Sequence, residues 1–419
     1  MKQYTTAFKA RVLQRLVGPR AISAYRLAAE VGVSQVTLSR WLDQSGLLTR
    51  SVRSHITGFT DMLRQVLRWI LGIAGVIVMS VAIYAASLRP HAPPLRDAES
   101  GEIVEGVVSL ERVTLNGRPQ WISIRGRSAR LPLLLYLSGG PCGSEMAWMR
   151  YYHAALERHY LVVNWDQQCA GKSYGAADWD RLAPADLVAD AGVLIDNLLT
   201  RYAQPNLLLV GNSWGSIPGV RVAARWPLKL KGYVGVTQQV SIQESDSLGW
   251  ALTREAALHA GQVKDVANLN ELGPPPYPRE HFLRSYLSLI NFQNRYGGSS
   301  RANAAASGQI RVALTAPEYG AMDRLHWVWS LKRGWETIYW QLAQQNMDFE
   351  REIPSLDVPV YLLLGRRDLV VPPVLAERWL SRLAAPRKQV QWFEGAGHTL
   401  MVSDAAAVDS FLVSILPRP

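Results

Sequence analysis

The feature that most constrains the fold is a serine held between two glycines directly after an apolar run. The run covers residues 207–210, and the chain continues as Gly211-Asn212-Ser213-Trp214-Gly215. A short apolar run of this kind predicts a buried parallel strand, and residues 217–226 predict a helix. A strand, a sharp turn and a helix with serine at the apex form a nucleophile elbow, which lifts the serine hydroxyl clear of the sheet.

Buried strands alternate with helix-like segments over the C-terminal three quarters of the chain. The predicted strands are apolar or mostly apolar runs at residues 131–137, 161–165, 207–210, 233–236, 358–364 and 389–393. Alternation of this kind predicts an α/β fold with a doubly wound, mostly parallel sheet and helices on both faces. Asn116-Gly117, between predicted strands at 107–115 and 120–124, predicts a hairpin turn. Between 237 and 353 the alternation stops, which predicts an inserted helical cap.

Two further polar residues follow predicted strands, as the elbow does. Asp368 comes after the run at 358–364, and His398 comes after the run at 389–393. The chain order serine, acid, histidine is the one expected for a triad that accompanies this elbow. Nucleophilic catalysis needs a base that reaches the hydroxyl and an acid that fixes the tautomer of the base. The sequence therefore predicts Ser213 as nucleophile, His398 as base and Asp368 as its partner.

Three motifs together resemble one family. They are Ser138-Gly139-Gly140-Pro141-Cys142-Gly143, Trp165-Asp166-Gln167-Gln168-Cys169-Ala170-Gly171-Lys172-Ser173 and Gly211-Asn212-Ser213-Trp214-Gly215-Ser216. Over residues 104–416 the chain resembles the prolyl-iminopeptidase-like branch of the α/β-hydrolases, although Ser138 and Gln168 replace a histidine and an arginine of the family pattern. The resemblance implies that the backbone N–H groups of Gly140 and Trp214 form the oxyanion hole, whose donors stabilise the tetrahedral intermediate by ~3–4 kcal/mol each.

The only two cysteines of the chain stand where this family has glycines. Cys142 replaces the last glycine of the first motif, and Cys169 replaces the glycine after the arginine of the second. In the fold that the resemblance implies, the two loops face each other across the mouth of the site. A disulfide between Cys142 and Cys169 is the prediction, and two unrelated free thiols are the alternative.

The substrate is predicted only as a class. An aminopeptidase needs carboxylates for the α-amino group of its substrate, and Glu145, Glu244 and Glu336 are candidates by residue type and region. An esterase needs only an apolar pocket, for which Trp327 and Trp335 of the predicted cap are candidate lining residues. No cofactor and no metal are implied, and two cysteines do not provide a zinc cluster.

The basic character of the chain belongs to its N-terminal segment. Residues 1–68 hold 11 Lys and Arg against 3 Asp and Glu, which accounts for +8 of the net charge of +11. Helical periodicity at 6–16, 22–30 and 35–44, with Gly32 and Ser34 before the third helix, predicts a helix-turn-helix. Residues 1–45 resemble the N-terminal helix-turn-helix of insertion-sequence transposases, which implies nucleic-acid binding. A basic three-helix appendage without a DNA target is the alternative.

A run of 20 residues without a charge, 69–88, is long enough to span a bilayer as a helix. The basic segment 46–68 precedes it, so the positive-inside rule predicts a cytoplasmic N-terminus and a hydrolase domain outside the cytoplasm. One alternative is a signal peptide that starts at Met62 and is cleaved near Ala86. The other is a buried helix of the soluble domain. Residues 89–103, which contain three prolines, predict a linker.

The predicted organisation is a membrane-anchored serine hydrolase that acts on an amide or an ester. The segments are a helix-turn-helix at 1–45, a juxtamembrane segment at 46–68, a membrane helix at 69–88, a linker at 89–103, hydrolase core at 104–238, a cap at 239–353 and hydrolase core again at 354–419. The alternative function is a membrane-tethered DNA-binding regulator whose hydrolase-fold domain serves as a sensor.

Overall fold

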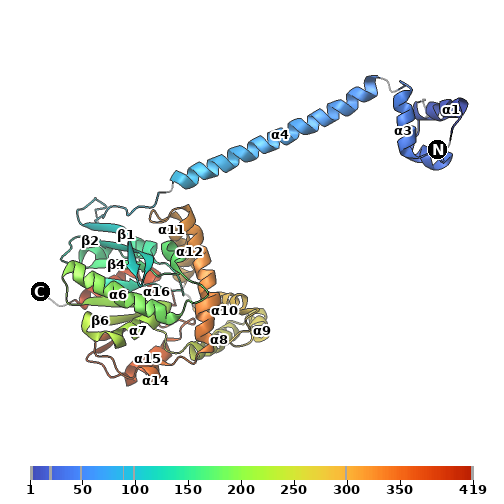
Figure 1. The fold of residues 1–419 in the computed structure, drawn as a ribbon. Helices are drawn as coiled ribbons and strands as arrows, with labels where there is room; N and C mark the ends of the chain where they lie inside the picture. The colour runs from blue at the N-terminus through green and yellow to red at the C-terminus, as the bar shows by residue number, and fades with distance from the viewer. Residues whose placement is uncertain are drawn as a thin grey trace. The chain divides into compact units, whose positions relative to one another are not determined.

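The computed structural model describes residues 3–17, 21–47, 50–87, 89–97, 100–297 and 300–416. The chain divides into two compact units, Met1–Ala85 and Ala86–Pro419. The first unit begins with three short helices (Figure 1): α1 (Thr6–Val17), α2 (Ala24–Val31) and α3 (Gln35–Gln44). Apolar side chains of this segment pack in one buried cluster of Val12, Leu27, Val33, Leu38 and Trp41.

Local signals in the sequence explain where α2 and α3 begin and end. The hydroxyls of Ser23 and Ser34 accept hydrogen bonds from N–H groups in the first turns of α2 and α3, which satisfies donors that a helix start leaves free. Gly32 ends α2 with φ of 66°, a conformation that glycine adopts without a steric penalty. The three helices lie where the sequence predicts them, and a helix-turn-helix that binds nucleic acid stays a prediction.

Helix α4 (Arg50–Ser87) contains the apolar segment of the N-terminal unit. Within it, Arg64–Ile83 has a mean hydropathy of 2.3, and none of that window is buried. Large apolar side chains such as Trp69 and Ile70 are exposed, which is not the pattern of the alternative, a helix buried in the soluble domain. Leu88, at which the predicted membrane helix ends, lies outside the described residues.

The second unit is built on a mixed, mostly parallel sheet of eight strands in the order β1-β2-β4-β3-β5-β6-β7-β8. Strands β1 and β2 pair antiparallel, as do β2 and β4, and the remaining neighbours are parallel. The predicted hairpin is confirmed, because Asn116 and Gly117 both have positive φ between the first two strands. The strands are β1 (Val107–Leu115), β2 (Arg118–Gly126), β3 (Leu133–Leu137), β4 (Leu161–Asp166), β5 (Leu207–Asn212), β6 (Leu230–Val236), β7 (Val360–Gly365) and β8 (Lys388–Phe393).

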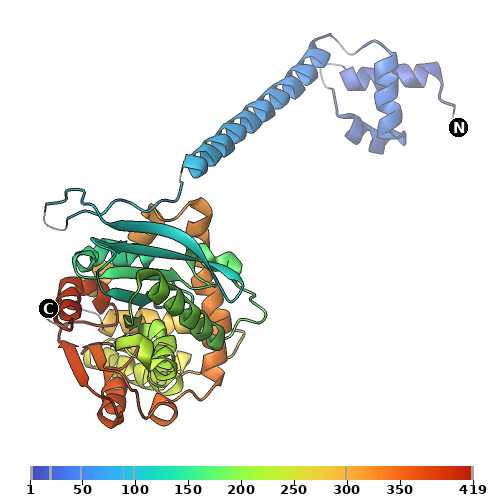
Figure 2. The same cartoon turned by 60° about the vertical axis from the view of Figure 1, so that its left-hand side comes forward.

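Helices lie on both faces of the sheet (Figure 1, Figure 2). Every residue of β3, β4, β5 and β7 is buried, as expected for parallel strands with both faces covered. Two apolar clusters, one on each face, contain side chains from alternate strand positions. The helices of this core are α5 (Met146–Tyr152), α6 (Pro184–Tyr202), α7 (Ser216–Arg225), α15 (Pro373–Arg382), α16 (Leu400–Ser403) and α17 (Ala405–Ser414).

A helical insertion separates β6 from β7, in the stretch where strand alternation stops in the sequence. A π-helical turn at Trp335–Tyr339 joins α12 to α13, and such turns are frequent at functional sites. The helices are α8 (Ile242–His259), α9 (Val263–Leu272), α10 (Phe282–Gly297), α11 (Ser300–Thr315), α12 (Ala321–Gly334), α13 (Trp340–Gln344) and α14 (Phe349–Glu352).

Candidate active site

The elbow serine lies at a tight strand-to-helix turn. Ser213 directly follows β5 and has φ of 49°, in the left-handed region that side chains other than glycine seldom adopt. A Cβ atom on Gly211 would lie 2.5 Å from the carbonyl oxygen of Gly215, and one on Gly215 would lie 2.1 Å from that of Leu137. The two glycines are therefore required by close backbone approach on either side of the serine.

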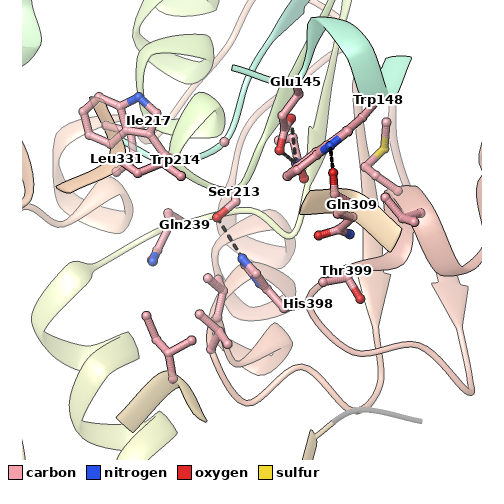
Figure 3. Close-up of a pocket in the computed structure, with 18 of the residues that line it drawn as sticks. Glu145, Trp148, Ser213, Trp214, Ile217, Gln239, Gln309, Leu331, His398 and Thr399 are labelled. Carbon is pink, nitrogen blue, oxygen red and sulfur yellow. Dashed lines mark hydrogen bonds between the residues drawn. The ribbon is translucent and has the colours of Figure 1, made fainter. Parts of the chain in front are cut away.

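Ser213, His398 and Asp368 form a continuous hydrogen-bonded chain. The Oγ of Ser213 lies 2.9 Å from Nε2 of His398 (Figure 3), and Nδ1 of His398 lies 2.9 Å from Oδ2 of Asp368. The other oxygen of Asp368 accepts the backbone N–H groups of Val370 and Val371, at 2.9 Å each. Because a carboxylate only accepts, Nδ1 carries the hydrogen, and Nε2 is the acceptor that faces the serine in the neutral imidazole.

The charges around His398 favour its protonated form. Burial lowers the pKa of His398, but the carboxylate of Asp368 raises it through its charge and its hydrogen bond, and the charge of Glu145 raises it further. The net effect is a raised pKa. An imidazole in this environment is a stronger base toward the hydroxyl proton of Ser213 than an isolated histidine is.

The loop after β3 contains the first of the two predicted oxyanion-hole residues. Gly140 has φ of 142°, and a Cβ atom there would lie 2.4 Å from the backbone nitrogen of Gly143, so only glycine fits. Gly140 and Trp214 line the same cavity as Ser213 and His398. The structure therefore brings both residues to the same cavity as Ser213.

Cys142 and Cys169 are joined by a disulfide. Their Cα atoms are 5.2 Å apart, within the usual range for such bonds, and both side chains are fully buried. The bond joins the loop after β3 to the loop after β4. A Cβ atom on Gly334 would lie 2.9 Å from that of Cys142, so the end of α12 packs directly on this cross-linked loop.

Residues of the second motif hold the cap helix α12 against the core. The hydroxyl of Ser144 and the backbone N–H of Lys172 both donate to Asp166. Burial raises the pKa of Asp166 to about 7, although these two hydrogen bonds oppose the shift. The Nζ of Lys172 lies 2.7 Å from Oδ2 of Asp323 in the first turn of α12. The motif is therefore part of the junction between core and cap.

Glu145 is a buried carboxylate beside the elbow. Its oxygens accept hydrogen bonds from the hydroxyl of Tyr136 at 2.5 Å, from Nδ2 of Asn212 at 3.1 Å to each oxygen, and from the backbone N–H of Gly139. Burial raises the pKa of Glu145, and these hydrogen bonds only partly offset the shift. One side chain thus connects the ends of β3 and β5 with the loop that carries Gly140.

The other predicted binding residues separate into one that lines the cavity and three that do not. Trp335 lines it, beside Tyr339 with ring centroids 4.3 Å apart. Glu244 faces Arg378, which donates to both of its oxygens, and Glu336 binds Lys332 on the surface of α12.

Trp327 also lies outside the cavity wall. Its indole N–H donates to the carbonyl of Ser144 at 2.9 Å, and its ring packs in a cluster with Met146 and Tyr319. Glu244 and Trp327 therefore do not line this cavity, and each side chain is held by a partner far away in the sequence.

The cavity around Ser213 has a volume of about 350 Å³, within the range of small-molecule sites. Polar side chains lie among apolar ones (Figure 3), and Gln239, Gln309 and His153 are lining residues that the sequence analysis missed. Most of the wall is apolar, from Trp148, Met149, Ile217, Ile242, Ile290, Leu331, Trp335, Val370, Val371 and Met401. Among the residues that the structure describes, no group of three or more His, Cys, Asp or Glu side chains is arranged to hold a metal ion.

The fold and this site define an enzyme of the α/β-hydrolase class. The chain belongs to the Alpha/beta hydrolase family, whose family model matches residues 134–410.

One relative is similar to this chain in sequence, and two solved structures are similar to it in fold. A relative from Bacillus subtilis (strain 168), named probable aminopeptidase YbaC, is 26% identical over 300 residues, which is 70% of this chain and 92% of that protein. A proline iminopeptidase-related protein from Thermus thermophilus superimposes with a TM-score of 0.52 at 21% identity, over 74% of this chain and 96% of that one. A structure described among novel epoxide hydrolases from metagenomes of hot environments superimposes with a TM-score of 0.50 at 18% identity. The match covers 75% of this chain and 100% of that one. These two structural likenesses concern the fold alone, since one fold hosts different reactions.

Proposed function

We propose that the enzyme is a serine hydrolase that cleaves an amide or an ester through an acyl-enzyme formed on Ser213. The hydrogen-bonded chain from Ser213 through His398 to Asp368, with both distances at 2.9 Å, is the observation that carries this proposal. The Oγ of Ser213 attacks the carbonyl carbon while Nε2 of His398 takes its proton. Asp368 holds the imidazole in the tautomer that leaves Nε2 free to accept.

The later steps use the same groups. The carbonyl oxygen becomes negatively charged in the tetrahedral intermediate, and the backbone N–H groups of Gly140 and Trp214 are the proposed donors that stabilise it. His398 then gives its proton to the departing amine or alcohol, which leaves the acyl group on Ser213. Water, deprotonated by His398, releases the acid in a second passage through the same kind of intermediate.

The charges that line the cavity favour a neutral or positively charged substrate. Among the described residues of the wall, Glu145 is the only carboxyl group, and neither lysine nor arginine is present. An acidic substrate would therefore meet no cation, whereas a free amino group would gain from the charge of Glu145. This asymmetry supports an aminopeptidase, as does the similarity to the probable aminopeptidase of Bacillus subtilis.

Glu145 would act on an amino group through its charge more than through a direct hydrogen bond. Its oxygens already accept from Tyr136, Asn212 and Gly139, and a carboxylate has about four acceptor sites. The apolar remainder of the wall suits a hydrophobic acyl or alcohol group as well, which keeps an esterase as the second candidate.

A fluorophosphonate probe and one matched substrate pair test these proposals on the full-length protein. The probe should label the wild type, and Ser213→Ala should abolish the labelling and lower turnover by roughly 10⁴- to 10⁶-fold. Failure to label the wild type would favour the inactive sensor. The substrate pair is an aminoacyl anilide with a free or an acetylated amino group: a strong preference for the free amine supports an aminopeptidase, and none supports an esterase.

We further propose that Arg64–Ile83 anchors the enzyme in a membrane, with the hydrolase unit outside the cytoplasm. A helix of 20 residues is about 30 Å long, which matches the hydrocarbon core of a bilayer. A disulfide is also expected of a domain in an oxidising compartment. Protease added to spheroplasts should digest the C-terminal unit, and complete protection would reverse this topology. A mature N-terminus near Leu88 would instead establish a cleaved signal peptide.

A further inference from the structure

One face of α5 forms a wall of the cavity and presents polar groups at both of its ends. Glu145, Trp148, Met149 and His153 all line the cavity, and residues three or four apart share a face of a helix. Glu145 precedes the helix beside the elbow, whereas His153 follows its last turn. Eight residues at 1.5 Å each separate the two along the helix axis by about 12 Å.

His153 is a buried histidine with one nitrogen bound and the other free of partners. Its exposed fraction is 2%, and its Nδ1 lies 2.5 Å from Oδ1 of Asp409 on α17. Among the described residues, Nε2 of His153 is buried without a hydrogen-bond partner. Buried polar atoms in native proteins nearly always have a partner, so this nitrogen is a candidate contact for a bound molecule.

The partner of His153 determines what that nitrogen can recognise. Asp409 only accepts hydrogen bonds as a carboxylate, so Nδ1 of His153 carries the hydrogen and Nε2 is an acceptor in the neutral ring. The pair of a neutral imidazole and a carboxylate has a net negative charge. It favours a hydrogen-bond donor, either neutral or cationic, and disfavours an anion. Asp409 itself is not part of the cavity wall and contributes to a separate surface depression.

We propose that Nε2 of His153 binds a hydrogen-bond donor on the substrate, such as a hydroxyl or an ammonium group, remote from the scissile carbonyl. Asp409 is a positioning residue that fixes the tautomer of His153. This inference rests on the proposed hydrolase function and narrows it: the substrate is an ester or amide with a donor group in its acyl or leaving part. The cavity then has two polar ends, one at Ser213 and Glu145 and one at His153, with apolar wall between them.

Two substitutions separate the roles of the two nitrogens of His153. In His153→Asn the amide N–H takes the place of Nδ1 and keeps the bond to Asp409, while the acceptor at Nε2 is lost. In His153→Gln the amide reaches the position of Nε2 and the bond to Asp409 is lost. His159→Asn is the matched control, because His159 is an exposed histidine outside the catalytic cavity.

The substrates are esters in matched pairs that end in a hydroxyl or a methyl group. One series lengthens the acyl group and the other lengthens the alcohol, and rates are normalised to the Ser213 sites titrated by fluorophosphonate. In one of the two series, at the chain length that places the terminal group beside Nε2 of His153, we expect the wild type to prefer the ester that ends in a hydroxyl. The preference should appear as a lower KM than that of the ester ending in a methyl group. His153→Asn should reduce that preference by about tenfold, the effect of one hydrogen bond, whereas His153→Gln should retain most of it and His159→Asn all of it.

Three results would overturn the proposal. They are a wild type without preference in either series, an unchanged preference in His153→Asn, and a preference that His153→Gln loses but His153→Asn keeps. The last result would assign His153 a structural role through Asp409. Failure of the underlying hydrolase proposal would appear differently, as a wild type that the fluorophosphonate does not label.

Discussion

Removal of the disulfide should cost the Ala86–Pro419 unit about 3.5 kcal/mol of stability. Cys142 and Cys169 are 27 residues apart in the sequence, and on the chain-entropy model a cross-link of that span restricts the unfolded chain by about 3.5 kcal/mol at 25 °C. We expect Cys142→Ala combined with Cys169→Ala to lose this amount. Because Cys142 has φ of 58°, glycine at position 142 should recover about 1 kcal/mol relative to alanine.

The assay measures unfolding of the full-length protein, kept in detergent solution, by urea in one experiment and by heat in another. For a unit of this size, 3.5 kcal/mol corresponds to a fall in Tm of about 5 °C, and the glycine variant should melt between the alanine variant and the wild type. The loop after β3 that the disulfide cross-links also carries Gly140, so labelling of Ser213 by fluorophosphonate should slow in the variants. Equal midpoints for wild type and variant, or two alkylatable thiols in protein from its native compartment, would refute the reasoning.

Two buried carboxyl groups give further predictions. Burial lowers the pKa of His398 while Asp368 and Glu145 raise it, so Glu145→Gln should shift the acid limb of the kcat/KM profile to lower pH; an unshifted limb would contradict this. Burial raises the pKa of Asp246 to about 7, against about 3.9 in an unfolded chain. The folded state therefore keeps a proton that the unfolded state releases, and stability falls as pH rises between these values by up to about 1.4 kcal/mol per pH unit. Asp246→Asn should flatten this slope in urea midpoints measured across that range, and an unchanged slope would refute the assignment.

The sheet and the elbow could be predicted because their signals are local. The strands β3, β4, β5 and β7 are buried along their whole length, so their sequences are mostly apolar and can be recognised without knowledge of their neighbours. The backbone requires glycine at 211 and 215 because a side chain would collide there, and it favours Asn116-Gly117 in the hairpin because both residues have positive φ. In each case the residue type directly reflects the local conformation. The order of Ser213, Asp368 and His398 along the chain follows from the order of the strands that carry them.

The walls of the cavity could not be predicted in the same way, because their side chains are oriented by distant partners. Arg378, 134 residues from Glu244, holds that carboxylate on the surface. Trp327 is of a residue type that often lines pockets, but its indole N–H donates to the carbonyl of Ser144, 183 residues away. Only the structure shows that His153 belongs to the wall, and its role depends on Asp409, 256 residues further on.

The two departures from the family pattern alter the surroundings of the motif loops and leave the reacting groups in place. Ser138, in place of a histidine, accepts the backbone N–H of Glu145 at 3.2 Å. Gln168, in place of an arginine, donates to Asp190 at 3.1 Å, whose pKa is raised by burial. An arginine at position 168 would bring a compensating positive charge to Asp190, whereas the amide leaves its negative charge in place.

Neither departure touches the hydrogen-bonded series of Ser213, His398 and Asp368, whose residues lie in the loops after β5, β8 and β7. A positive charge of the family pattern is thus absent at position 168, whereas the proposed nucleophile, base and acid are all present. Because differences in substrate come from the groups around the reacting atoms, we expect the departures at 138 and 168 to alter which carbonyl compounds bind, and the bond-breaking chemistry to follow the family. Gln168→Arg, assayed with the aminoacyl anilides and the ester pairs described above, tests this step: a changed order of preference with retained labelling of Ser213 is expected, and loss of labelling in a folded variant would contradict it.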